Sequence, residues 1–535
     1  MEAYEYDYLI VGGGTAGCIL ANRLTASGIH RVLMLEAGGE PDSMWINIPA
    51  GFSKLLTDTR YNWRFQTEAE DNTNGRVISV PRGKGLGGST LINGMVYVRG
   101  QPGDYDGWRD GGARGWSWQD VEPYFRKLEN YEKGGPTRGH EGPMKLEQVR
   151  ERFPISDAFI AAAREDGLPF NEDYNAGRQE GVGYYQVTQN RGRRWSAYEA
   201  YLRPALRRNN LKVITQAHVL RLELDGRRCI GVTYRKDGVE TTVKARAEVI
   251  LSAGAIQSPQ LLELSGIGRP ELLQAHGIPV RHALAGVGEN YIDHFCTRMN
   301  WRVKGAVTLN EMSRSWRLGL AVSQYFTRRT GILTLGTGLV NAFVRTSPEL
   351  PTADAQFFFV HASYANAAER ILDTLPGMTI GVTQLRPRSV GSIHIKSADS
   401  LAGPSIRPNF LADPLDREVM VRSMRIARRI VGQPALRPHV AEETSPGPAV
   451  ESDADWLAFA RQNGQTIYHP IGTCRMGEDA GAVVDLRLKL HGLEGLRVVD
   501  ASVMPKMVSG NIQAAVMMVA EKAADLILED HAARI

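Results

Sequence analysis

Residues 8–36 read YLIVGGGTAGCILANRLTASGIHRVLMLE, and the order of apolar and glycine positions in this stretch decides the fold. The apolar run at 8–11 is typical of a buried parallel strand. Residues 16–24 predict a helix, and residues 32–35 predict a second strand. A strand, a glycine-rich turn, a helix and a second strand form the βαβ pattern of a Rossmann-type nucleotide site.

Three glycines and one acid in this stretch have separate physical roles. Gly12 permits the tight turn, Gly14 lets the backbone approach a pyrophosphate, and Gly17 lets the helix pack closely on the strand. The helix N-terminus presents unpaired N–H groups and partial positive charge to phosphates. Glu36, nineteen positions after Gly17, can accept hydrogen bonds from both ribose hydroxyls. The stretch predicts a bound dinucleotide and makes a redox enzyme the leading interpretation.

Length and composition limit the remaining possibilities. The chain has 535 residues, of which 43% are hydrophobic and 23% charged, values typical of a globular protein of two or three domains. Its net charge of +4 is small and points to no nucleic-acid partner. The four scattered cysteines favour neither a disulfide framework nor a metal site. With no recognisable signal peptide and no apolar run of membrane-spanning length, we expect a cytoplasmic protein.

Patterns further along the chain predict an α/β (mixed α+β) fold in which the two ends share one domain. Short strands are expected between 212 and 252, as a meander that rejoins a parallel sheet. Alternating runs predict an antiparallel sheet, and amphipathic segments predict flanking helices. The alternating runs are 355–361, 378–386 and 391–396, and the helical segments are 414–432, 452–463 and 514–529. We expect a Rossmann-like nucleotide domain (1–155, 205–295 and 465–535) and a substrate domain built on the antiparallel sheet (156–204 and 296–464).

Two further segments are candidates for ligand contact. Residues 82–100, RGKGLGGSTLINGMVYVRG, suit a backbone laid against a flat ligand, although a flexible loop is the simpler alternative. Residues 254–268, GAIQSPQLLELSGIG, follow a strand and predict a helix with Ser258 as N-cap and Pro259 at its first position.

These two segments resemble the signature patterns of the glucose–methanol–choline (GMC) oxidoreductase family. The resemblance covers nearly the whole chain and includes Asn62-Trp63, VGENYIDH at 287–294, YHPIGT at 468–473 and GNIQ at 510–513. The chain looks most similar to bacterial alcohol and choline dehydrogenase-like members, including those that act on long-chain alcohols or polyethylene glycol.

The resemblance implies FAD as the cofactor. It implies contacts of the glycine turn with the pyrophosphate, of Glu36 with the ribose and of Val219 with the adenine. A histidine that bonds covalently to the flavin in some relatives is replaced by Ile92, so the FAD is expected to be non-covalent. The full set of implied cofactor residues is Gly12, Gly14, Thr15, Ala16, Gly17, Glu36, Ala37, Arg82, Gly88, Asn93, Gly94, Met95, Val96, Val219, Ala253, Asp500, Ala501, Ile512 and Gln513.

The resemblance also implies a catalytic pair, His469 and Asn511. A histidine has an unperturbed pKa near neutrality and can remove the hydroxyl proton of an alcohol. The Asn511 amide can donate to the alkoxide that forms. A lone histidine in such a turn is more often structural, and the asparagine alone is most simply a turn residue. His294, Cys474 and Ser89 are weaker candidates.

Electron transfer leaves alternatives open. The leading hypothesis is an FAD-dependent dehydrogenase that oxidises a primary alcohol to the aldehyde and passes electrons to a quinone or another carrier. An oxidase that reduces dioxygen to hydrogen peroxide is a close alternative. A lyase or a non-redox flavoprotein on the same fold is the second alternative. The oligomeric state is not indicated by the sequence.

Two features concern the substrate and the surroundings of the enzyme. Residues 312–329 read as a basic amphipathic helix, which either packs its apolar side on the protein or lies on the inner face of an anionic membrane. Residues 357–359, Tyr364 and the stretch 330–340 could shape an apolar pocket, although strand alternation places half of them in the core. Their composition favours a neutral alcohol over a sugar or choline.

Overall fold

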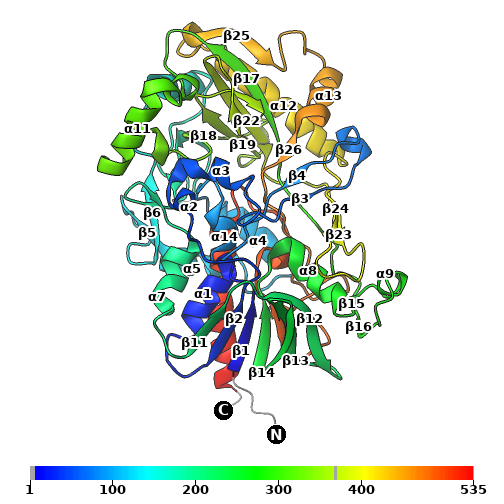
Figure 1. Cartoon of the computed structure of the whole chain (residues 1–535). Helices are drawn as coiled ribbons and strands as arrows, with labels where there is room; N and C mark the ends of the chain where they lie inside the picture. Colours follow the sequence, from blue (N-terminus) through cyan, green and yellow to red (C-terminus); the bar gives the residue numbers. More distant parts are fainter. Residues whose placement is uncertain (1–5, 367–369, 534–535) are drawn as a thin grey trace.

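The N-terminal βαβ unit forms as the sequence predicts. The structure is a computed structural model, and it describes residues 6–366 and 370–533. Strand β1 (Tyr6–Val11), helix α1 (Thr15–Leu24) and strand β2 (Val32–Leu35) follow each other, and the two strands are parallel and fully buried. Helix α1 lies against the C-terminal helix α14 (Gln513–Ala532), so the two ends of the chain share one layer (Figure 1).

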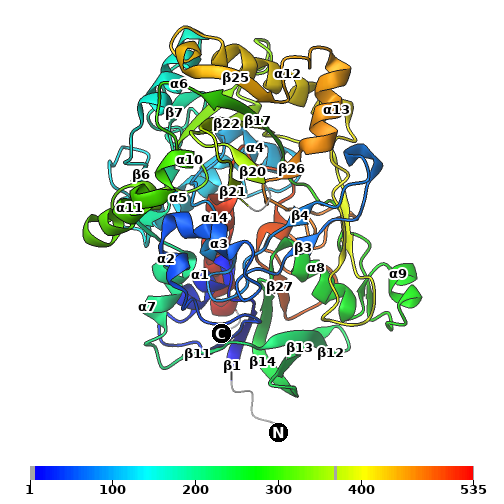
Figure 2. The same ribbon diagram turned by 45° about the horizontal axis from the view of Figure 1, so that its top comes forward.

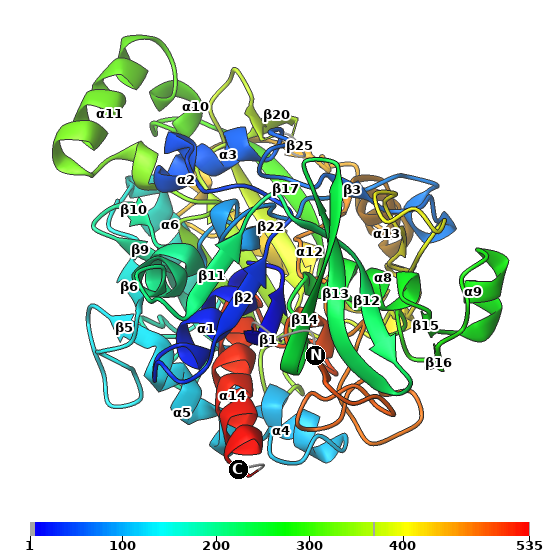
Figure 3. The same cartoon turned by 60° about the horizontal axis from the view of Figure 1, so that its bottom comes forward.

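This unit belongs to a seven-stranded sheet. Its order is β11-β2-β1-β14-β13-β12, and β27 pairs with β14. At the end of the stretch where short strands are expected, the chain forms one long strand, β14 (Val239–Leu251), which is antiparallel to β13 in its first half and parallel to β1 in its second half. Figure 3 shows the long antiparallel β12-β13-β14 ribbon beside the parallel strands. The other strands are β11 (Leu211–Ile214), β12 (His218–Asp225), β13 (Arg228–Lys236), β14 (Val239–Leu251) and β27 (Leu496–Val498).

The middle of the chain forms the expected antiparallel sheet, in the order β25-β17-β22-β19-β18-β7, with β26 paired to β17. Helix α12 (Pro414–Val431) covers β22 (Figure 2). Helices α6 (Pro154–Glu165) and α13 (Asp453–Asn463) pack against α12. Its strands are β7 (Gly181–Tyr184), β17 (Phe295–Val303), β18 (Val340–Val344), β19 (Ala355–Val360), β22 (Gly377–Gln384), β25 (Val440–Ser445) and β26 (Gln465–Thr466).

Residues 391–396 do not join this sheet. They contribute β23 (Ser392–His394), which pairs only with β24 (Ser405–Arg407) in a separate two-stranded ladder. The alternation of this segment is therefore satisfied in a hairpin rather than in the large sheet.

The segment at 254–268 starts its helix earlier than the sequence predicts. Helix α8 spans Gly254–Leu264, so Pro259 lies inside the helix and Ser258 is not its N-cap. The Ser258 hydroxyl instead donates to Asp500 Oδ2 at 2.6 Å. The capping prediction is wrong because the hydrogen-bond partner of Ser258 comes from the far end of the chain.

Short helices and loops follow the N-terminal βαβ unit between residues 44 and 128. The two largest hydrophobic clusters of the described residues lie around the parallel sheet and around the antiparallel sheet. The division into domains at the expected boundaries stays a prediction. The short helices of this region are α2 (Met44–Asn47), α3 (Phe52–Leu55), α4 (Pro102–Asp110) and α5 (Trp118–Leu128).

Helix α11 (Ser315–Arg328) projects from the edge of the molecule in all three views (Figures 1–3). Only Ala321 and Tyr325 are buried along it. Trp316 is 69% exposed and Leu320 is 60% exposed, so the apolar side of this helix is not packed on the protein. Across the described residues, no helix combines the length and the apolar character needed to cross a membrane.

Candidate active site

A cavity of about 300 Å³ is lined by residues of both sheets and of the loops between them. It gathers both predicted catalytic residues and every predicted cofactor residue except Gly17. Those lining it are Gly12, Gly14, Thr15, Ala16, Glu36, Ala37, Arg82, Gly88, Asn93, Gly94, Met95, Val96, Val219, Ala253, His469, Asp500, Ala501, Asn511, Ile512 and Gln513.

The glycine turn forms one end of this cavity. Gly12 has φ +100°, and a Cβ there would lie 2.6 Å from the Ser252 carbonyl oxygen, so only glycine fits. A Cβ on Gly17 would lie 2.0 Å from the Gly12 oxygen, which places Gly17 behind the turn, where helix and strand pack together. No side chain caps the N-terminus of α1. Its first N–H groups therefore suit the phosphates of a dinucleotide.

Glu36 lines the same end and is already held by three backbone groups. Its Oε2 accepts from Gly13 N at 2.7 Å, and its Oε1 accepts from Gly38 N at 2.7 Å and Gly85 N at 3.1 Å. A carboxylate has about four acceptor sites, so one remains for a ribose hydroxyl.

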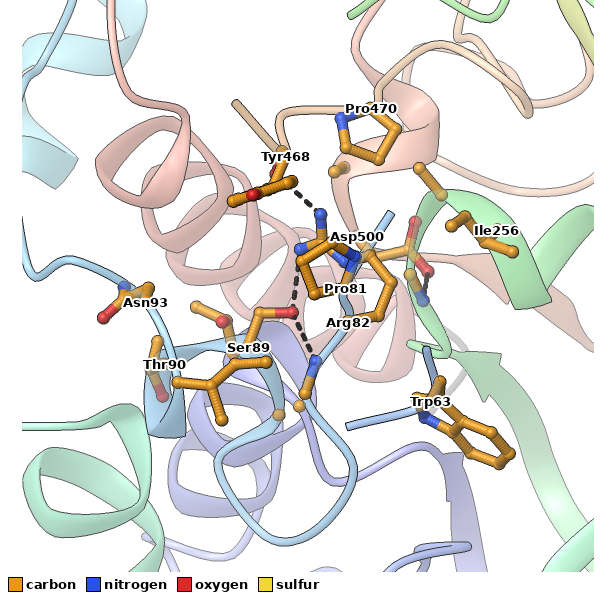
Figure 4. Close-up of a pocket in the computed structure, with 18 of the residues that line it drawn as sticks. Trp63, Pro81, Arg82, Ser89, Thr90, Asn93, Ile256, Tyr468, Pro470 and Asp500 are labelled. Carbon is orange, nitrogen blue, oxygen red and sulfur yellow. Dashed lines mark hydrogen bonds between the residues drawn. The ribbon is translucent and has the colours of Figure 1, made fainter. Parts of the chain in front are cut away.

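The glycine-rich segment at 82–100 runs along the middle of the cavity and is not a free loop. The Arg82 guanidinium donates to the Tyr468 carbonyl at 2.6 Å and to the Ser89 hydroxyl at 2.7 Å (Figure 4). Farther along, Asn93 Nδ2 donates to Gln513 Oε1 at 2.6 Å. The contacts with Tyr468 and Gln513 join this segment to the C-terminal part of the chain, which holds the predicted catalytic pair.

Asp500 stands on the opposite wall, beside the first turn of α8 (Figure 4). Its carboxylate accepts from Gly254 N at 2.9 Å, Ser258 Oγ at 2.6 Å and Ser502 N at 2.8 Å. Burial raises the pKa of Asp500, and these three donors oppose that shift. The network fixes the wall on which Ala501 and Ala253 also lie.

His469 is held in the cavity by a constrained turn. Tyr468 before it has φ +73°, a conformation that non-glycine residues rarely adopt. The His469 N–H donates to Asp293 Oδ1 at 2.8 Å, while Asp293 Oδ2 accepts from Thr466 and Tyr291 hydroxyls. The surrounding hydrogen bonds therefore compensate the strain and hold the imidazole in place.

The tautomer of His469 follows from its neighbour His294. His294 Nε2 lies 2.9 Å from the Leu385 carbonyl, which can only accept, so this nitrogen carries the hydrogen. Neutral His294 then has a lone pair on Nδ1, which lies 3.0 Å from His469 Nδ1. His469 must donate across this contact, which leaves the lone pair on its Nε2.

Asn511 faces that lone pair. Its Nδ2 lies 3.3 Å from His469 Nε2, and its Oδ1 accepts from Gln356 Nε2 at 3.4 Å. Gln356 thus orients the amide so that its donor side points toward His469. A base nitrogen and a hydrogen-bond donor stand side by side in the cavity.

Burial sets the charge of both histidines. It lowers the pKa of His294 to about 4. Burial, then His294 and Arg82, lower the pKa of His469 well below its usual value. Both imidazoles are neutral at pH 7, and neutral His469 is the form that can accept a proton.

The antiparallel sheet supplies the remaining wall. Arg298 of β17, Gly381 of β22 and Phe358 of β19 stand opposite one another in register. Phe358 lines the cavity, whereas Phe357 and Phe359 are fully buried, as the alternation predicts. The sequence did not single out Arg298 or Gln356, although the two arginines within the stretch FCTRMNWRV at 295–303 were a signal.

Comparisons with known proteins agree with this site. Models of the GMC oxidoreductase family match residues 6–296 and 387–520. The alcohol dehydrogenase [acceptor] of Pseudomonas putida is 40% identical over 98% of this chain and 96% of its own length. The mitochondrial choline dehydrogenase of Homo sapiens is 41% identical over 98% of this chain and 90% of its own length. A structure of an Aspergillus oryzae formate oxidase, solved to study FAD modification, has a TM-score of 0.92 with 28% identity and covers 99% of both chains.

A glycine turn that suits a dinucleotide and a buried, neutral histidine lie in one cavity, an arrangement that suits a redox enzyme. The chain belongs to the GMC oxidoreductase family, whose members bind FAD. The resemblance deduced from the sequence motifs is confirmed, and so is the mixed α/β fold.

Proposed function

We propose that the protein oxidises a primary alcohol to the aldehyde, with His469 as the base and Asn511 as the hydrogen-bond donor to the substrate oxygen. One observation supports this most directly: the hydrogen bonds of His294 leave the lone pair of His469 on Nε2, beside the Asn511 amide. Bound FAD supplies the hydride acceptor.

Residues of the chain can accept the hydroxyl proton of the alcohol. Neutral His469 takes the hydroxyl proton on Nε2, and its Nδ1–H stays hydrogen-bonded to His294. The resulting imidazolium and the Asn511 amide both donate toward the alkoxide oxygen, a contact that strengthens as negative charge develops. Burial of the site excludes water, which strengthens these interactions.

Other residues of the cavity suit FAD that is bound without a covalent bond. Ile92, at the position of the covalent histidine of some relatives, lines the cavity with an apolar side chain that cannot form such a bond. The uncapped N-terminus of α1 would hold the pyrophosphate, Glu36 the adenosine ribose, and the segment at 93–96 with Gln513 the ring system.

An anaerobic substrate panel tests the proposal. We expect one or more primary alcohols to bleach the flavin absorbance of the holoenzyme within the time of a turnover, with the aldehyde as product. Failure of every alcohol to reduce a bound flavin would favour the lyase or non-redox alternative. Reoxidation by a quinone analogue at least tenfold faster than by air-saturated buffer is expected for a dehydrogenase, and the reverse ratio would indicate an oxidase.

We also propose that α11 places the enzyme on an anionic membrane surface. The exposed apolar side chains Trp316, Leu320 and Phe326 share this projecting helix. The stretch 312–332 contains four arginines (Arg314, Arg317, Arg328, Arg329) and no acidic residue, so its charge is complementary to anionic lipid. Such contact would bring the enzyme to a membrane quinone.

Vesicle sedimentation tests this contact. Vesicles of phosphatidylglycerol and phosphatidylcholine should bind the protein, pure phosphatidylcholine should bind it at least tenfold more weakly, and high salt should release it. The double variant Trp316→Ser/Leu320→Ser should reduce binding at least tenfold. Leu401→Ser is the matched control, because Leu401 is as exposed as Leu320. Equal binding by the double variant, or a dimer that this variant alone abolishes, would overturn the proposal.

A further inference from the structure

Arg298 is a buried cation whose surroundings contain too few acceptors. It is 6% exposed, and its Nη1 donates to Gln465 Oε1 at 2.9 Å. Its Nε and Nη2 have no hydrogen-bond partner. No ion pair joins Arg298 to a carboxylate within residues 6–366 and 370–533.

The other buried arginines of the described residues, Arg99, Arg138, Arg194 and Arg497, have more hydrogen-bond acceptors than Arg298. Arg99 and Arg138 both pair with Glu129, and Arg497 pairs with Glu248. Arg194 donates to three oxygen atoms, and only its Nη2 has no partner, as in Arg138, whereas Arg298 leaves both Nε and Nη2 without one. Burying a charged group without such partners costs free energy, so two unused donors on Arg298 indicate that a ligand supplies the acceptor.

The sheet aims Arg298 at the substrate end of the cavity. Gly381 stands between Arg298 and Phe358 on neighbouring strands, and a Cβ on Gly381 would lie only 1.9 Å from the Phe358 ring. The ring therefore lies over Gly381, with its centroid 5.8 Å from the Arg298 guanidinium. Arg298, Phe358 and Gln356 all line the cavity that holds His469 and Asn511.

A second cation lies at the same end. Arg370 lines the cavity, with its guanidinium over the rings of Phe52 at 6.0 Å and Tyr364 at 5.6 Å, and its Nε has no partner. The charge of Arg370, after burial, lowers the pKa of Arg298, so the two guanidinium groups act on each other. Two neighbouring cations in one pocket attract an anion and repel a cation.

We infer that the substrate is an alcohol that also bears a carboxylate, which Arg298 binds with its free Nε and Nη2 while the hydroxyl meets His469. This inference rests on the proposed alcohol oxidation and names its substrate class. A guanidinium matches a carboxylate in a two-point contact, and Nε with Nη2 is one edge that can make it. The phenyl ring of Phe358 beside Arg298 favours a flat or apolar spacer between the two functional groups.

The inferred substrate differs from the neutral alcohol that the composition of the sequence favours. The two arginines also disfavour choline. A quaternary ammonium in this pocket would face two arginines, and no carboxylate among the described lining residues stands at the substrate end. The acidic lining residues, Glu36 and Asp500, are occupied by backbone and hydroxyl donors of the cofactor end.

Matched substrates test the inference without any mutation. We expect kcat/KM for 4-(hydroxymethyl)benzoate to exceed that for its methyl ester by at least tenfold, with benzyl alcohol no better than the ester. An ester or benzyl alcohol that is oxidised as efficiently as the carboxylate would overturn the inference while leaving alcohol oxidation intact. If no alcohol reduces the flavin, the proposed function fails first, and the binding experiment below still decides the subsite.

Variants identify the residue. Arg298→Gln should raise KM for the carboxylate at least tenfold, change its kcat less than threefold, and leave the ester within threefold. Arg298→Lys should retain part of the preference for the carboxylate because it keeps the charge.

A binding experiment needs no turnover. Benzoate, which cannot be oxidised, should perturb the flavin spectrum of the wild-type holoenzyme and bind at least tenfold more weakly to Arg298→Gln. Arg422→Gln, on the exposed side of α12, is the control. Equal losses for ester and carboxylate would make Arg298 a structural residue and overturn the inference.

Discussion

Replacement of His469 by alanine is expected to slow flavin reduction by alcohol about 10²- to 10⁴-fold, the range that general-base catalysis contributes. The variant should still bind FAD, because His469 lies at the substrate end of the cavity and makes no contact with the glycine turn. Stopped-flow measurement of flavin bleaching under anaerobic conditions gives this rate directly. His140→Ala, at an exposed position, is the matched control. Near-wild-type bleaching by His469→Ala would remove the base from the mechanism.

The pH dependence adds a readout that a structural role would not produce. Because the pKa of His469 is lowered, the neutral base persists below pH 6.5, and kcat/KM should stay level until the pH falls well below that value. His294 contributes to this lowering, so in His294→Ala the pKa of His469 should rise and the acid limb should move to higher pH. The same variant loses the acceptor for His469 Nδ1–H, and we expect about a tenfold lower kcat. An unchanged kcat would contradict the tautomer argument, and an unmoved acid limb would show that His294 does not lower the pKa of His469.

The sequence was sufficient where local pattern alone decides structure. The strand at 32–35 has the predicted bounds, and the helix predicted at 452–463 begins one residue later, because a continuous apolar run and amphipathic periodicity are local signals. The cofactor end of the cavity could also be predicted from the sequence, since the glycine spacing encodes a turn that only glycine can adopt. His469 and Asn511 were identified through family resemblance rather than through the residues themselves.

The remaining features depend on contacts between distant segments. His294 and His469 are 175 positions apart, so the hydrogen bond that sets the tautomer has no local signature. Ser258 carries the pattern of a helix cap, yet Asp500 takes its hydroxyl. Arg298 points into the cavity because of the register of three strands and the missing side chain of Gly381. Such register is fixed by long-range packing, which one sequence does not reveal.

Gly14→Ala is expected to yield a folded protein that has lost most of its FAD. A Cβ on Gly14 would have no neighbour closer than 3.8 Å, and its φ of −73° is open to alanine, so the fold should tolerate the methyl group. The methyl would nevertheless stand where the backbone must approach the pyrophosphate. We expect FAD affinity to fall at least about 100-fold, or about 2.8 kcal/mol, measured by fluorescence titration of the apoprotein.

Two further glycines separate cofactor loss from misfolding. Gly12→Ala combines φ +100° with a Cβ 2.6 Å from the Ser252 oxygen, so this variant should be destabilised whether or not FAD is present. Gly103→Ala, in α4, adds a methyl group that meets nothing within 4 Å and should change neither stability nor FAD content. Only Gly14→Ala should therefore keep the melting temperature of the apoprotein while losing the upward shift that FAD gives the wild type. Wild-type FAD affinity in Gly14→Ala would mean that the pyrophosphate lies elsewhere, and the role assigned to the N-terminal turn would be wrong.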